Sequence, residues 1–80
     1  MPLNAYPNPA HEAVTVALPT SMQSRPATLL DLRGRVVRRW VVPAQQAETR
    51  LSLEALATGV YLLQVQGGDA LYQQKIVVAP

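Results

Sequence analysis

The stretch L-E-A-L-A-T-G-V-Y-L-L-Q-V, residues 53–65, decides the fold of this chain. Leu53 and Leu56 are apolar anchors three residues apart. Thr58 and Gly59 mark a turn in which we expect the backbone to need a positive φ at glycine. Residues 60–65 are mostly β-branched, aromatic or aliphatic, as is typical of a strand. Alternation along a strand makes both faces of this one largely apolar, which predicts a position in the middle of a sheet.

Similar patterns extend outward from this stretch in both directions. Residues 13–18 and 49–53 alternate between apolar side chains and polar or small ones, as half-buried strands do. Further strands are predicted at residues 27–32, 36–42 and 70–79, and the proline-rich start could supply a seventh. Their spacing and the turn signals between them predict an all-β fold, an antiparallel sandwich of two sheets.

The connections carry their own signals. D-L-R-G-R at residues 31–35 predicts a tight hairpin turn with Gly34 at positive φ, and Q-G-G-D at residues 66–69 predicts a second one. We expect residues 23–26 to be a polar loop and residues 54–57 to form one helical turn. Either face of the strand at residues 36–42 places an arginine among apolar residues. That strand is therefore expected to lie at an edge or to carry a β-bulge.

The composition limits the possible functions. A chain of 80 residues makes one small domain, and the absence of cysteine excludes disulfides and thiolate metal sites. A net charge of +2 is too small for a typical nucleic-acid binder. No apolar run approaches the roughly 18 residues of a membrane span, and no signal-peptide pattern is present. We expect residues 1–5 to be a linker or a non-native start, and residues 6–80 to form the domain.

The reactive side chains do not make a recognisable catalytic or metal site. His11 stands beside Glu12, but there is no second histidine to complete a metal site, so a solvated loop pair is the favoured interpretation. The five carboxylates are scattered, and no serine has a base in a recognisable arrangement. We therefore expect neither an enzyme nor a cofactor.

One charged cluster remains, made of Arg33, Arg35, Arg38, Arg39 and Trp40. It could be a basic patch with an aromatic side chain, suited to nucleic acid or to an anionic glycan. It could equally be the solvated face of a hairpin, whose charges discourage aggregation along the sheet edge. We favour the second interpretation because the net charge is low, and we expect Trp40 to be buried or half-buried.

Several motifs together resemble a known family. They are Y-P-N-P at Tyr6, Pro7, Asn8 and Pro9; D-L-R-G-R-V-V from Asp31, which includes Gly34; L-A-T-G-V-Y-L-L-Q-V at residues 56–65; and K-I-V-V at Lys75, Ile76, Val77 and Val78. In this order and spacing they are similar to the C-terminal sorting domain of the type IX secretion system, also called the Por secretion tail domain. The resemblance covers nearly the whole chain.

The resemblance implies an immunoglobulin-like β-sandwich of about seven strands at the C-terminus of an exported protein. Such a domain acts as the sorting signal for the cargo protein that lies N-terminal to it. The outer-membrane translocon recognises it, and in many members a sortase-like peptidase removes it, leaving the cargo at the cell surface or outside the cell. The family's recognition residues match Gly59, Tyr61, Lys75, Ile76, Val77 and Val78 here.

Two further hypotheses follow from the strand pattern and the resemblance. Because a sheet edge can accept a partner strand, we expect residues 70–78 and the neighbouring turns to form the recognition surface. The alternative function is a glycan-binding or adhesion module of an extracellular protein, which would use Trp40, Tyr72 and the arginines as its binding face.

Overall fold

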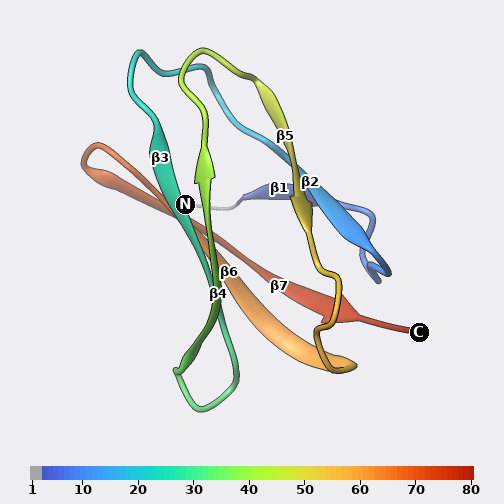
Figure 1. The fold of residues 1–80 in the computed structure, drawn as a ribbon. Coiled ribbons are helices and arrows are strands. Elements are labelled where there is room, and N and C mark those ends of the chain that lie inside the picture. Colours follow the sequence, from blue (N-terminus) through green and yellow to red (C-terminus); the bar gives the residue numbers. More distant parts are fainter. Residues whose placement is uncertain (1–2) are drawn as a thin grey trace.

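The computed structural model describes residues 3–80, which form seven antiparallel strands in two packed sheets (Figure 1). The three-stranded sheet has the order β1 (Asn4–Tyr6), β2 (Ala13–Ala17), β5 (Glu48–Ser52). The four-stranded sheet has the order β4 (Val36–Val42), β3 (Arg25–Leu30), β6 (Gly59–Gly67), β7 (Ala70–Val78). In it β3, β6 and β7 are neighbours, as strands C, F and G are in immunoglobulin-type sandwiches. The predicted all-β sandwich of about seven strands is confirmed.

The strand within the opening stretch lies inside its sheet, as predicted. β6 is hydrogen-bonded to β3 on one side and to β7 on the other. Tyr61, Leu63 and Val65 are buried on its inner face, whereas Val60 and Leu62 on the other face are half-buried. Two hydrogen-bonded neighbours and one fully buried face are the surroundings that an apolar strand of this kind requires.

The apolar core of residues 3–80 lies between the two sheets, and its buried members are aliphatic apart from Tyr61. Side chains from β2 and β5 meet those of β3, β6 and β7, as alternation along each strand predicts. The largest fully buried side chains are Leu29, Leu51, Leu53, Leu63, Ile76, Val14, Val16, Val42 and Val65. A continuous core of this kind ties all seven strands into one domain.

β4 is an edge strand, and the predicted arginine conflict is resolved there. Arg38 turns towards the other sheet and donates a hydrogen bond from Nη1 to the Ser52 carbonyl, at 3.2 Å. A register shift between Leu29 and Leu30 also marks an irregularity in the pairing of β3 with β4. Of the two alternatives expected, the edge position is therefore confirmed, and a register shift in the same strand pair accompanies it.

The hairpin between β3 and β4 is held by Asp31. Gly34 has a φ of +83°, as predicted, and its amide donates to the Asp31 carbonyl. The Asp31 carboxylate accepts hydrogen bonds from the amides of Arg33 and Arg35, and its ion pair with the Arg35 side chain measures 2.9 Å. The hydrogen bond from the Arg35 amide, followed by those from the Arg35 side chain and the Arg33 amide, lowers the pKa of Asp31. In the hairpin from β6 to β7, Gly68 has a φ of +60°.

Three local expectations were wrong. Gly59 does not have a positive φ but begins β6; the left-handed residue of this connection is Ala55, with a φ of +66°. Residues 54–57 form a turn rather than a helical turn, because the chain reverses there with one hydrogen bond from the Leu56 amide to the Leu53 carbonyl. Arg25, expected in a loop, begins β3.

The N-terminal segment is part of the sandwich. Leu3 is buried and β1 starts at Asn4, inside the segment that we expected to be a linker. β1 pairs with β2 over three residues, which supplies the seventh strand that the proline-rich start could form. Residues 1 and 2, the beginning of the expected linker, lie outside the described residues.

Candidate functional site

The hairpin of β6 and β7 brings the two halves of the predicted recognition set together. Gly59 lies opposite Val78, and Tyr61 lies opposite Ile76. These pairs are at the end of the sheet away from the hairpin turn, so the G-x-Y element and the terminal strand share one end of the sandwich.

Burial divides this set into two groups. Tyr61, Ile76 and Val78 have exposed fractions of 8%, 0% and 3%, so they belong to the core. Lys75 is exposed and Val77 is half-buried, and alternation places both on the outer face of the sheet. A partner of the folded domain can therefore touch the Lys75 and Val77 side chains but not the three core side chains.

Tyr61 fastens the connection from β5 to the start of β6. Its hydroxyl donates a 2.5 Å hydrogen bond to the Ala57 carbonyl, four residues upstream. Its ring lies close to Gly59, where an added Cβ would stand 3.8 Å from Tyr61 Cε2. This arrangement resembles the tyrosine corner of immunoglobulin-type sandwiches, in which a tyrosine near a strand start clamps the preceding crossover. Gly59 and Tyr61 thus have evident structural roles.

The Y-P-N-P segment covers the outer edge of β7. The Asn8 side chain acts like a short piece of strand: Nδ2 donates to the Lys75 carbonyl at 3.1 Å, and Oδ1 accepts from the Val77 amide at 3.0 Å. The Ala10 amide donates to the Val77 carbonyl, and the Ala79 amide donates to the Ala10 carbonyl. The bonds continue upstream, where the Leu3 amide donates to Gln73.

This contact overturns the expectation that β7 offers an open edge to a partner strand. One edge of β7 pairs with β6. Along the other edge, from Gln73 to Ala79, several backbone groups are already hydrogen-bonded to residues 3–10. A strand could add there only after residues 3–10 had left. Asn8 lies between Pro7 and Pro9, and the peptide bonds before both prolines are cis. Tyr6 donates a hydrogen bond to the Glu48 carboxylate, and this bond raises the pKa of Tyr6.

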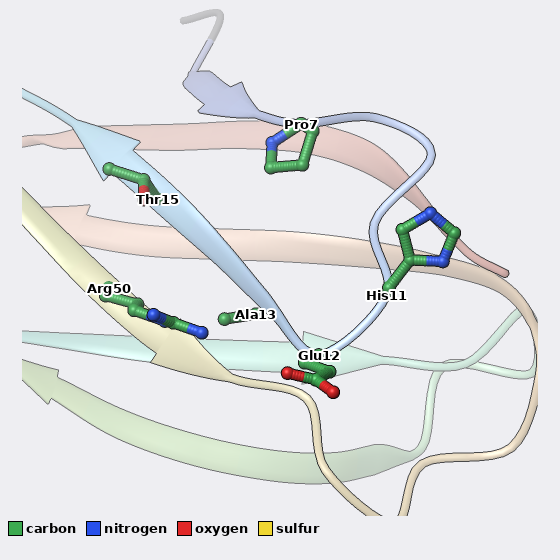
Figure 2. Close-up of a pocket in the computed structure, with 6 residues that line it drawn as sticks. All are labelled: Pro7, His11, Glu12, Ala13, Thr15 and Arg50. Atoms are coloured by element: carbon green, nitrogen blue, oxygen red, sulfur yellow. The ribbon is translucent and has the colours of Figure 1, made fainter. Parts of the chain in front are cut away.

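Two shallow hollows adjoin the same end of the sandwich. One has a volume of about 350 Å³, and Figure 2 shows His11 and Pro7 on one side of it and Thr15 and Arg50 on the other. The second, of about 400 Å³, is lined by the chain end at Ala79 and Pro80 and by residues of the connection from β5 to β6. His11 and Glu12 line both hollows and are exposed, as expected of a solvated pair.

Within residues 3–80, no three His, Cys, Asp or Glu side chains gather closely enough to hold a metal ion. Nor does this part of the chain contain a helix that is long and apolar enough to cross a membrane.

Comparison with known families identifies the domain. The sequence matches the secretion system C-terminal sorting domain over residues 4–79, from the first residue of β1 to the residue after β7. The chain belongs to this family. No relative was found among the curated proteins compared.

Membership gives the domain its function. It is a sorting domain of the type IX, or Por, secretion system, a non-catalytic signal that directs a cargo protein for secretion. This function implies contact with the secretion machinery and a cargo that is secreted or displayed at the cell surface.

The arginine cluster of the sorting domain does not form one patch. Arg38 bonds to Ser52 between the sheets, Arg35 pairs with Asp31, and Arg39 points to the other face of β4. Trp40 is half-buried against the core, as expected, and also lines a hollow of about 460 Å³ on β3 and β4.

The aromatic face of the alternative glycan-binding function is also missing. Trp40 is on β4 and Tyr72 is on β7, the two edge strands of the same four-stranded sheet. Both side chains pack against the core. They are therefore separated by β3 and β6 and cannot stack together on one sugar.

Sequence reasoning missed Arg25, the one buried charged residue in the part of the chain that the structure describes. It is 5% exposed and shares the inner face of β3 with Ala27 and Leu29. Extending the alternation of β3 backwards by two residues would have placed it inward. The proline at position 26 concealed that signal, because proline is depleted in strands.

Proposed function

We propose that the outer-membrane translocon of the secretion machinery binds the sorting domain. The contact is the outer face of β7 near the C-terminal end of that strand. Lys75 and Val77 are the members of the predicted set whose side chains a partner can reach. The accessibility of these two side chains is the observation that carries the proposal. Gly59, Tyr61 and the core residues of β7 hold this surface in shape.

The physical basis is a rigid surface rather than a reactive group. Asn8 and Ala10 bond to the backbone of β7 on one side, and β6 pairs with it on the other. β7 is therefore held on both edges, and Lys75 and Val77 are presented in a defined geometry at little further cost in conformational entropy. A partner surface with a carboxylate facing Lys75 and an apolar contact for Val77 would complement them.

We also propose that the cargo precedes the domain and that a sortase-like peptidase removes the domain ahead of Leu3. Residues 3–10 are bonded into the sandwich through β1, Asn8 and Ala10. Peptidases act most readily on exposed, unpaired backbone, and a cut inside this segment would first require it to detach.

An export assay tests the recognition surface. The domain is fused behind a signal peptide and a fluorescent reporter, in a bacterium with a working type IX system and in its translocon-deficient mutant. We expect the reporter outside the first strain and in the periplasm of the second. The double variant Lys75→Ala with Val77→Thr should hold the reporter in the periplasm of both strains.

The matched control is the double variant Leu71→Thr with Gln73→Ala, on the same strand and the same face. It should be exported like the parent domain. Circular dichroism and a thermal melt must show that each variant is folded. Full export of the Lys75 and Val77 variant, in a folded domain, would refute the proposed surface.

A further inference from the structure

A further hollow, of different chemistry, lies at the opposite end of the sandwich. It has a volume of about 220 Å³ and is lined by the connection from β2 to β3 (Pro19, Thr20, Ser21), by Arg25, by Gly67 and Gly68 of the last hairpin, and by Tyr72. Figure 1 shows that this hairpin and this connection occupy the same end of the molecule. It is remote from the recognition surface proposed above, because Gly59 and Gly67 are the two ends of β6.

The guanidinium of Arg25 is buried with unused hydrogen-bonding capacity. Its Nη1 donates to the Pro19 carbonyl at 2.9 Å. Nε and Nη2 are also buried, and neither has a hydrogen-bond partner among residues 3–80. No carboxylate lies within ion-pair distance of it, since the ion pair within the described residues is that of Arg35 and Asp31.

This state is costly unless something compensates it. A buried charge without a counter-ion, and buried donors without acceptors, both destabilise a fold. The fork formed by Nε and Nη2 matches the two oxygens of a carboxylate or a phosphate.

The walls of the hollow suit an anion. The Ser21 hydroxyl accepts a hydrogen bond from the Gln23 amide and keeps its own proton to donate. Gly67 leaves space for the arginine: a Cβ there would lie 3.3 Å from Arg25 Cδ and 3.2 Å from Tyr72 Cε2. Among the described residues that line the hollow, none is acidic.

We propose that this hollow binds a small oxyanion, a carboxylate or a phosphate, through Nε and Nη2 of Arg25, with the Ser21 hydroxyl as a further donor. Because both nitrogens are buried, the anion enters when the half-buried Tyr72 ring or residues 19–21 shift aside. This site is independent of the recognition surface proposed above. If the hollow bound no anion, the sorting function would be unaffected.

The test follows the Arg25 Nε–H signal by ¹⁵N-edited NMR in the 80-residue chain. Inorganic phosphate and acetate are titrated separately at constant ionic strength, with chloride as the reference. We expect a saturable shift of this signal, and an unfolding temperature that rises with the logarithm of the anion concentration. Saturation by phosphate alone would identify a phosphate site, and saturation by acetate would identify a carboxylate site.

Variants separate specific binding from charge screening. Arg25→Lys keeps the charge but removes the fork, and should abolish the anion-dependent rise in unfolding temperature. Ser21→Ala should weaken binding several-fold while leaving Arg25 in place. Arg39→Lys, at an exposed arginine of β4, is the matched control and should behave like the parent. A shift that chloride reproduces, or stabilisation that persists in Arg25→Lys, would overturn the proposal.

Discussion

Replacing Tyr61 by phenylalanine isolates the hydroxyl that fastens the crossover from β5 to β6. The change removes the hydrogen bond to the Ala57 carbonyl and keeps the buried ring. Ala57 is an exposed residue, and the expected loss is that of one hydrogen bond, about 0.5–1.5 kcal/mol. For a domain of this size a loss of about 1 kcal/mol lowers the unfolding temperature by about 4–8 °C.

Tyr61→Ala extends the comparison to the ring itself. Deleting a large buried aromatic side chain costs about 3–5 kcal/mol. A chain of 80 residues has a total stability of roughly 4–12 kcal/mol at about 0.05–0.15 kcal/mol per residue. The alanine variant should therefore be markedly destabilised, whereas the phenylalanine variant should remain well folded at 25 °C.

Urea unfolding followed by the fluorescence of Trp40, the single tryptophan, measures both losses. The midpoint for Tyr61→Phe should fall while the slope stays that of the parent, because the surface exposed on unfolding hardly changes. Tyr72→Phe is the control, since the Tyr72 hydroxyl has no hydrogen-bond partner within residues 3–80. An unchanged urea midpoint for Tyr61→Phe would refute the stabilising role of the hydrogen bond from the Tyr61 hydroxyl to Ala57. Lost export in that variant, at full stability, would instead make the hydroxyl a recognition group.

Three further predictions concern turns and edges. Gly34→Ala, at a φ of +83°, should cost about 1–2 kcal/mol, whereas Gly59→Ala, with its nearest neighbour at 3.8 Å, should leave the melting temperature nearly unchanged. Equal losses at both positions would contradict this. Asn8→Ala removes two hydrogen bonds to β7 and should cost about 1–2 kcal/mol; hydrogen exchange of the β7 amide that Asn8 binds should accelerate. The hydrogen bond from the Arg35 amide lowers the pKa of Asp31 below 3.8, so its stabilising effect is present above that pH and is lost as the pH falls through the folded-state pKa. Acid should therefore weaken Asp31→Asn less steeply than the parent in urea unfolding, and parallel pH profiles would exclude this role.

Alternation and turn chemistry are local properties, and for that reason they were predictable. The strand at residues 36–42 was predicted with its observed ends, because β-branched residues are bounded there by a glycine turn and a proline. Gly34 was correctly placed at positive φ because Asp31 and glycine together favour a tight turn. The prediction of a positive φ at Gly59 was wrong because glycine permits that conformation without requiring it. Ala55, four residues earlier, has the positive φ instead.

Of the candidate site, the sequence identified the motifs but not which of their side chains are accessible. By itself it determined the all-β class, the central position of β6 and the family, because each strand pattern and each family motif consists of residues near one another in the chain. Only the tertiary structure decided that Asn8 covers the edge of β7, 69 residues away, and that Arg25 is buried under the connection from β2 to β3. Contacts between distant segments depend on how the two sheets pack, and no local pattern of side chains encodes that packing.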